Sequence, residues 1–164
     1  MNPLRQGGST MTDESKKLVA YCGLYCGDCF AHQGTIADLA RDLRKELRQA
    51  RFDKTATSLA EVPFFKKFKH YPECYDVLGA MVKFRCSSGC KAGGGDPGCK
   101  IRKCCKRKAI EGCWECGDFE ECDMFEFLEQ NHGNAHILNI RKIKKIGVCE
   151  FLDGKKHWYH IPRK

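Results

Sequence analysis

Apolar residues between positions 35 and 83 recur every three or four positions, which is the period of amphipathic α-helices. Thr35 and Asp38 have capping-box spacing, and the run that follows reaches about Arg51. Its apolar face consists of Ile36, Leu39, Ala40, Leu43 and Leu47. A second box, Ser58 with Glu61, predicts a short helix through Phe64, Phe65 and Phe68. Pro72 fits the first turn of a third helix, whose apolar face is Cys74, Val77, Leu78, Met81 and Val82.

The second half of the chain has a weaker pattern. Residues 86 to 118 have little periodicity and many glycines, so metal ligation is expected to replace a hydrophobic core there. Helical patterns return at 123–130 and 135–146, with Gly147 as the expected C-cap of the latter. Asp153-Gly154 lies between two apolar-containing runs near the end and predicts a short C-terminal β-hairpin.

The pattern as a whole predicts a mainly α fold. We expect a small helical domain organised around cysteine-rich loops and spanning residues 18–164. Residues 1–17 are polar and are expected to be a disordered leader. The chain has neither an apolar stretch of the roughly 20 residues that cross a membrane nor a secretory signal. We therefore expect a cytoplasmic protein with no membrane partner, whose thiols stay reduced rather than forming a disulfide framework.

Ten of the thirteen cysteines fall in four short clusters with the spacing of metal ligands. They are Cys22, Cys26, Cys29, Cys86, Cys90, Cys99, Cys104, Cys113, Cys116 and Cys122. Ten thiolates fill two tetrahedral zinc sites and leave two thiols over. The surplus thiols could donate weakly to the metal-bound sulfurs, be ligands that a histidine replaces, or belong to a third, incomplete site. We expect two zinc ions, with an iron-sulfur cluster as the alternative. The preferred grouping puts Cys86, Cys90, Cys99 and Cys104 in one site and Cys26, Cys29, Cys113 and Cys116 in the other.

Other chemistry suits the cysteine spacing less well. The spacing of Cys22, Cys26 and Cys29 occurs in radical-SAM enzymes, but the strand and helix alternation of their barrel is absent. The C-x2-C pairs do not sit in the strand-helix-strand pattern of redox dithiols. Cys74 and Cys149 are expected to be small core residues. Cys105 lies among lysines that favour its thiolate, which makes it the first suspect for a thiol-based enzyme.

The charge is arranged in blocks. Residues 83–108 carry nine basic side chains against Asp96 alone, whereas residues 109–131 carry eight acidic side chains and no basic ones. The basic run KIRKCCKRK suits phosphate binding, so nucleic acid is one candidate partner. We expect the acidic block to fold against this run and neutralise it.

The strings YCGLYCGDC, GCKAGGGDPGCKIRKCCKRK and EGCWECGDFEEC, followed by HILNIRKIKKIG, resemble a prokaryotic cysteine-rich family, domain of unknown function 3795. The resemblance runs from about Tyr21 to Leu152. It implies zinc binding by the ten clustered cysteines and supplies no reaction. The favoured function is a binding or regulatory module with structural zinc and a protein partner. The alternatives are a thiol-based or metal-dependent enzyme and a nucleic-acid-binding module.

Overall fold

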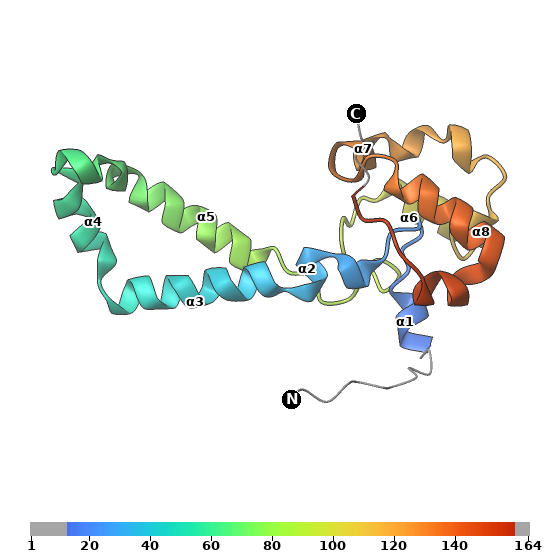
Figure 1. Ribbon diagram of the computed structural model, residues 1–164, viewed down its shortest axis with the longest axis horizontal. Coiled ribbons are helices and arrows are strands. Elements are labelled where there is room, and N and C mark those ends of the chain that lie inside the picture. The colour runs from blue at the N-terminus through green and yellow to red at the C-terminus, as the bar shows by residue number, and fades with distance from the viewer. Residues whose placement is uncertain (1–12, 160–164) are drawn as a thin grey trace, which may run out of the picture. The chain divides into compact units, whose positions relative to one another are not determined.

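The computed structural model describes residues 13–159, and helices dominate them (Figure 1). The α-helices are α1 (Asp13–Lys17), α2 (Phe30–Gln33), α3 (Thr35–Gln49), α4 (Phe52–Ala60), α5 (Tyr71–Lys83), α6 (Lys100–Lys108), α7 (Glu126–His132) and α8 (Ala135–Asp153). Short 3-10 helices occupy Cys26–Asp28, Pro63–His70, Cys113–Glu115, Phe119–Glu121 and Asp123–Phe125. Within residues 13–159 the β pairing is one isolated bridge between Val19 and Tyr25. The predicted mainly α fold is confirmed.

The described residues form two compact units. The first combines residues 13–28 with residues 88–159 and contains most of the clustered cysteines, so we call it the cysteine-rich unit. The second comprises residues 29–87 and is dominated by α3 and α5, which lie side by side and antiparallel (Figure 1). We call it the hairpin unit.

The core of the cysteine-rich unit is built around α8. Ile140, Ile143 and Phe151 of this helix are fully buried against apolar side chains from the loops and short helices. Those side chains are Val19, Leu24, Ile101, Trp114, Phe119, Phe125 and Leu128. Gly147, the expected C-cap, instead lies inside α8 with φ of 82° and ψ of 164°, so the helix is kinked there and then continues.

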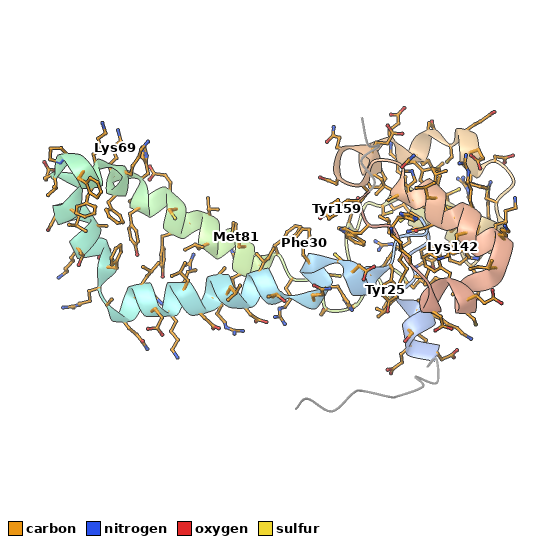
Figure 2. The ribbon with its side chains drawn as sticks, viewed as in Figure 1. Tyr25, Phe30, Lys69, Met81, Lys142 and Tyr159 are labelled. Carbon is orange, nitrogen blue, oxygen red and sulfur yellow. The ribbon has the colours of Figure 1, made fainter. Side chains whose placement is uncertain are left out.

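The predicted C-terminal β-hairpin is wrong. Val148, Phe151 and Leu152 follow the helical spacing, and α8 continues to Asp153, where the Gly154 amide donates to the carbonyls of Glu150 and Phe151. The tail after Gly154 then bonds to side chains of α8 instead of pairing with a strand. The Asn139 amide group exchanges two hydrogen bonds with the His157 backbone, and Lys142 (Figure 2) donates to the Lys155 carbonyl.

The hairpin unit confirms the predicted helix at 35–51 and the helix with Pro72 in its first turn, but neither of the two capping boxes. Gly34 is the N-cap of α3, without a side-chain cap, and Thr35 is already helical. Ser58 lies inside α4, where its hydroxyl donates to the Lys54 carbonyl, so the second capping box is wrong. The chain then forms a 3-10 helix over Pro63–His70 before α5 begins with Pro72 in its first turn.

Four α-helices, α1, α2, α4 and α6, lie where the pattern predicted none. Helix α1 falls within the expected leader; it has acidic residues in its first turn and lysines in its last, which complements the helix dipole. Residues 1–12 of that leader lie outside the described residues. Helix α6 forms within the segment of low periodicity, because Ile101 and Cys105 give it a narrow buried face among basic side chains.

Candidate metal centre

Four cysteines from two distant segments lie together in the cysteine-rich unit. They form the first thiol group, which consists of Cys22, Cys26, Cys90 and Cys99. The amide nitrogen of Cys90 is 3.4 Å from Sγ of Cys26 and donates to it. Charge on Cys90, Cys99 or Cys26 raises the pKa of Cys22, so the four sulfurs share one environment.

A tight turn positions the first sulfur of the group, that of Cys22. The Ala20 amide donates to the Leu24 carbonyl at 2.8 Å, and the Gly23 amide donates back to the Ala20 carbonyl at 2.9 Å. Gly23 has φ of +80°, and a Cβ there would meet Cγ1 of Ile140 at 2.8 Å, so the turn requires glycine. Residues 20–24, which include Cys22, are thereby held against α8.

A buried arginine shapes the loop that carries Cys90 and Cys99. The Arg102 guanidinium is 7% exposed and donates to three backbone carbonyls, those of Cys90 (3.3 Å), Gly94 (2.7 Å) and Asp96 (2.6 Å). Cys99 is the N-cap of α6, and its Sγ accepts from the Arg102 amide at 3.5 Å. One residue therefore closes the glycine-rich loop and fixes the start of α6.

The electrostatics of the first thiol group favour neutral sulfur in the absence of a cation. Burial is the main cause that raises the pKa of Cys22, and a hydrogen bond from the Leu24 amide opposes it. Burial likewise raises the pKa of Cys90, with partial compensation from the Tyr21 amide and from Arg102. A bound metal ion would reverse this preference, because it stabilises thiolate directly.

A second thiol group lines a cavity of about 470 Å³ next to α6. It consists of Cys104, Cys105, Cys113, Cys116 and Cys122. Sγ of Cys105 and Sγ of Cys113 are 3.7 Å apart, and Nζ of Lys108 donates to Sγ of Cys116 at 3.3 Å. The hydrogen bond between the two sulfurs lowers the pKa of Cys105 and raises that of Cys113, so this pair shares a proton.

The remaining cysteines lie elsewhere. Cys29 and Cys86 belong to the hairpin unit, where the Cys86 amide donates to the Ala31 carbonyl at 2.9 Å and the Cys86 carbonyl lies 3.2 Å from Nδ1 of His32. Cys74 and Cys149 are exposed, so their predicted core role is wrong. Cys105 is 1% exposed and lines the cavity of the second thiol group, and its suggested role as a nucleophile stays a prediction.

The predicted division of the sulfurs between two sites also needs correction. Cys90 and Cys99 do lie together, but Cys26 lies with them rather than with Cys113 and Cys116. The turn at Gly23 and the Arg102 loop bring these segments together, and sequence spacing carries no sign of either contact.

The described side chains do not form a closed coordination site as they stand. Within residues 13–159, no group of three or more Cys, His, Asp or Glu side chains is arranged so that it could hold a metal ion. The first thiol group nevertheless offers the kind of ligands that zinc prefers. It has four sulfurs, and two of them accept hydrogen bonds from backbone N–H groups. Binding would require the sulfurs to converge further.

The acidic block pairs with α8 as well as with α6. Glu120 forms a bidentate pair with Arg141, whose guanidinium lowers the pKa of that carboxyl, whereas Asp118 lies 4.0 Å from Nζ of Lys108. Lys100, Lys103, Lys106 and Arg107 are all exposed. The expected neutralisation of α6 by the acidic block is therefore limited to Lys108 among the ion pairs of the described residues.

Sequence reasoning missed three buried polar residues, Arg102, His136 and Asn139. Arg102 sits in a basic run, and the one signal that separates it from its exposed neighbours is its spacing of three from both Cys99 and Cys105. His136 is 1% exposed and packs against Phe125 with ring centroids 4.8 Å apart. Burial lowers the pKa of His136 to about 4, with a further contribution from His132.

The family comparison covers the segment that carries both thiol groups. The model of a family described as protein of unknown function (DUF3795) matches residues 18–127, about two thirds of the chain. The chain belongs to this family. No curated protein and no solved structure matches the chain. The family match includes the turn at Gly23, the Arg102 loop and α6, and it ends before α8. Among the described residues, the helices are too short or too polar to cross a membrane.

Proposed function

We propose that the chain is a zinc-binding module whose first thiol group holds a structural zinc ion. Zinc at this site would link residues 20–26 to residues 89–99. Four thiolates saturate a tetrahedral ion and leave no position for a substrate water, so the metal serves the fold rather than a reaction. The module then works by presenting a surface to a protein partner. A reducing compartment, as in the cytoplasm, keeps the thiols available.

The observation that carries this proposal is that four thiols from two distant segments share one environment and lie beside backbone amide donors. Cys26 and Cys99 each accept a backbone N–H bond, and such bonds stabilise metal-bound thiolate by delocalising its charge. A loop of three glycines and an aspartate would not adopt its ordered form for packing alone, because it has few side chains to bury. Arg102 supplies part of its order and the zinc would supply the rest.

The second thiol group is the proposed second zinc site, with Cys104, Cys113, Cys116 and Cys122 as ligands. All four line one cavity, and Lys108 lies beside Cys116 and within electrostatic reach of Cys104. Cys105 then acts as a weak donor to Cys113. Eight ligands in two sites leave Cys29 and Cys86 as the surplus pair, in the hairpin unit.

Metal analysis of anaerobically purified protein tests the proposal. We expect two zinc ions per chain and no visible chromophore, and cobalt substitution should give the intense bands of tetrahedral thiolate coordination. Cys99→Ser should lower the stoichiometry to one, whereas the exposed control Cys74→Ser should leave it at two. Stoichiometric iron would favour the iron-sulfur alternative instead, and absence of any bound metal would contradict both.

A second candidate function is nucleic-acid binding, which the exposure of four basic side chains on α6 favours. Lys100, Lys103, Lys106 and Arg107 lack a pairing acid among the described ion pairs, so they are available to phosphate groups. Replacing Lys103, Lys106 and Arg107 with Gln should weaken retention on a polyanion column. The slope of log affinity against log salt concentration should fall by the equivalent of roughly three phosphate contacts. Replacing Lys144 and Lys145 of α8 with Gln is the control for loss of positive charge on another helix. Equal retention of both variants and wild type would exclude α6 as the binding surface.

A further inference from the structure

The hairpin unit has almost no core of its own. Its buried hydrophobic residues are three alanines, Ala37, Ala40 and Ala56, although the unit contains 59 residues. Units below about 70 residues usually require disulfides, a metal ion or oligomerisation to supplement a small core. Cys29 and Cys86 are too few for a metal site, so association with another surface is the remaining route.

The missing core residues are present but lie on the surface. Six large apolar side chains on α3, on α5 and immediately after α5 are between 40% and 65% exposed. They form the apolar face, which consists of Ile36, Leu39, Leu43, Val77, Met81 and Phe84. Figure 2 shows Met81 on α5 and, at the start of α2, Phe30, which stacks on Phe84 with ring centroids 5.7 Å apart.

The six side chains share one side of the helix pair. At about 100° per residue, the stripe on α3 lies about 90° from the mean direction of Ala40 and Arg44, and the stripe along α5 lies about 150° from Tyr75, in the same rotational sense as seen from each helix's own N-terminus. These three residues are among those that pack α3 against α5. Because the helices are antiparallel, the same sense brings both stripes to one face.

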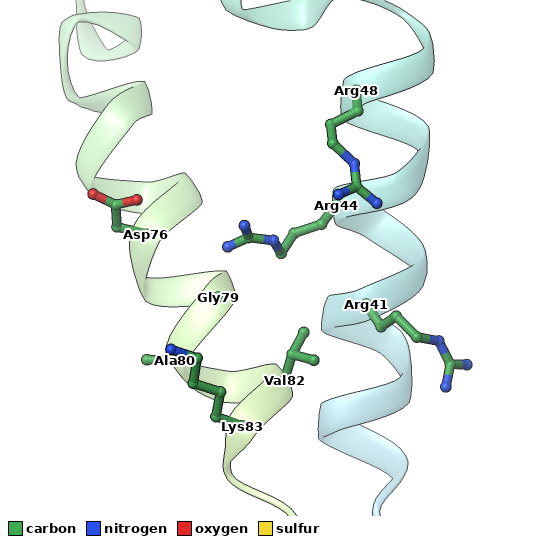
Figure 3. Close-up of a pocket in the computed structure, with 8 residues that line it drawn as sticks. All are labelled: Arg41, Arg44, Arg48, Asp76, Gly79, Ala80, Val82 and Lys83. Atoms are coloured by element: carbon green, nitrogen blue, oxygen red, sulfur yellow. The ribbon is translucent and has the colours of Figure 1, made fainter.

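The opposite side of the pair is basic. Arg41, Arg44, Arg48 and Lys83 line a groove of about 510 Å³ together with Asp76 (Figure 3). Arg44 reaches across it, donates to the Tyr75 carbonyl at 2.6 Å and lies 4.0 Å from the centre of the Tyr75 ring. Arg41 is paired with Asp38 and Asp42, but Arg44, Arg48 and Lys83 outnumber Asp76. This excess of positive charge disfavours association of two copies there and favours the apolar face as the contact surface.

We propose that two copies of this chain pair through the apolar face of the hairpin unit and form a four-helix bundle with two-fold symmetry. Within each stripe the apolar residues are three and four positions apart, at 36, 39 and 43 on α3 and at 77, 81 and 84 along α5. This is the a/d spacing of helices that interlock along a seam. A two-fold contact needs a surface complementary to itself, and a continuous apolar face meets that requirement.

The exposed area suffices for a stable dimer. Six side chains of this size, about half exposed, present roughly 600 Å² per copy. Two copies would bury about 1,200 Å², the lower limit of specific protein–protein interfaces, before any flanking residue is counted. A patch of this size is at the upper end of the range for the largest apolar patch on a monomer, and such patches often form interaction sites.

Light scattering after size-exclusion chromatography measures the mass of the full chain directly. We expect twice the mass of one chain for wild type and the mass of one chain for the double variant Leu39→Glu with Val77→Glu. Arg48→Glu is the matched control, because it changes the net charge equally on the opposite side and should leave the dimer intact. A wild type of single-chain mass at every accessible concentration would overturn the proposal, as would a double variant that remains dimeric.

Site-specific cross-linking keeps the test valid if the double variant does not fold. A photoreactive benzoylphenylalanine at Leu43 should give a covalent product of two-chain mass, whereas the same residue at Arg48 should not. Products of single-chain mass from Leu43 would mean that the same chain covers its own apolar face. Equal two-chain yields from both positions would mean non-specific contact. Neither readout depends on metal content, so failure here leaves the zinc proposal unaffected.

Discussion

The cysteine-rich unit and the hairpin unit reach stability by different means. The first buries Trp114, Phe125, Ile140 and Phe151 in a continuous core, whereas the second buries only alanines and exposes its larger apolar residues. Both contain helices with clear amphipathic periodicity. Periodicity therefore reveals which face of a helix is apolar but not whether the chain itself covers that face.

Local contacts maintain the hairpin unit in place of a core. Arg85 pairs with Asp38 and donates to the Gly34 carbonyl, while Phe52, Phe68 and Tyr71 form a ring cluster where α4 meets α5. These contacts are exposed or half-exposed, and exposed pairs contribute little individually. The hairpin unit should consequently respond weakly to single changes and the cysteine-rich unit strongly.

Metal removal should separate the units most sharply. A chelator should abolish hydrogen-exchange protection in residues 88–99 and in α6, because binding of structural zinc contributes on the order of 10 kcal/mol to folding. Helix α3 should keep its protection. Hydrogen-exchange mass spectrometry before and after confirmed metal loss measures both regions in one sample. Equal loss in α3 would show that the units do not differ in their dependence on metal.

Truncation of a buried side chain is the next largest effect. Ile143→Ala should cost about 2–5 kcal/mol of unfolding free energy, because it removes apolar contacts and leaves a cavity in the core around α8. Ile36→Ala, in the hairpin unit, should cost under about 1 kcal/mol when the protein is dilute. Denaturant titrations give both values. Similar costs would mean that Ile36 is covered in solution even in dilute protein.

The cysteine-rich unit should also lose stability in mild acid through His136. The folded state holds the pKa of His136 near 4, below its ordinary value of 6.5, so the unfolded chain binds the proton more tightly. Stability is therefore complete above about pH 6.5 and falls as the pH drops from there to about 4, by up to about 3 kcal/mol. His136→Phe should flatten this slope in denaturant titrations at several pH values. An unchanged slope would assign the acid sensitivity to other groups.

A glycine at the base of the hairpin unit should have the smallest effect of the four. Gly34 has φ of +76°, and a Cβ there would meet Nη2 of Arg85 at 2.5 Å. Gly34→Ala should cost about 1–2 kcal/mol from backbone strain, since the arginine tip can move. Gly117→Ala, whose Cβ would meet no atom within 4 Å, is the control and should be near neutral. Thermal unfolding of the two variants makes the comparison.

The sequence predicted those features that depend on local spacing. The helices over residues 35–51 and 71–83 were visible because apolar residues recur along them. Helix α6 was missed because six of its nine residues are basic, which hides the narrow buried face of Ile101 and Cys105. The C-terminal hairpin was wrong because Asp153-Gly154 ends a helix as readily as it turns a strand, and the burial of Phe151 decides between them.

The candidate site was predictable in composition but not in arrangement. The cluster spacings identified the cysteines, while the grouping of Cys26 with Cys90 depends on a backbone amide contact between residues 64 positions apart. Cys74 and Cys149 failed for a different reason. Their neighbours in the sequence are apolar, but both side chains are exposed in the structure. Long-range contacts of this kind leave no local signal.

The buried guanidinium of Arg102 has a consequence for the net charge of the proposed first zinc centre. Four thiolates and one Zn²⁺ carry a formal charge of −2, which a low-dielectric interior disfavours. Arg102 donates to the Cys90 carbonyl and offsets part of the rise that burial causes in the pKa of the Cys90 thiol, so it lies close enough to act as a counter-ion. Its single positive charge would reduce the formal total to −1. The residue that orders the loop would thus also make the occupied centre less costly to enclose.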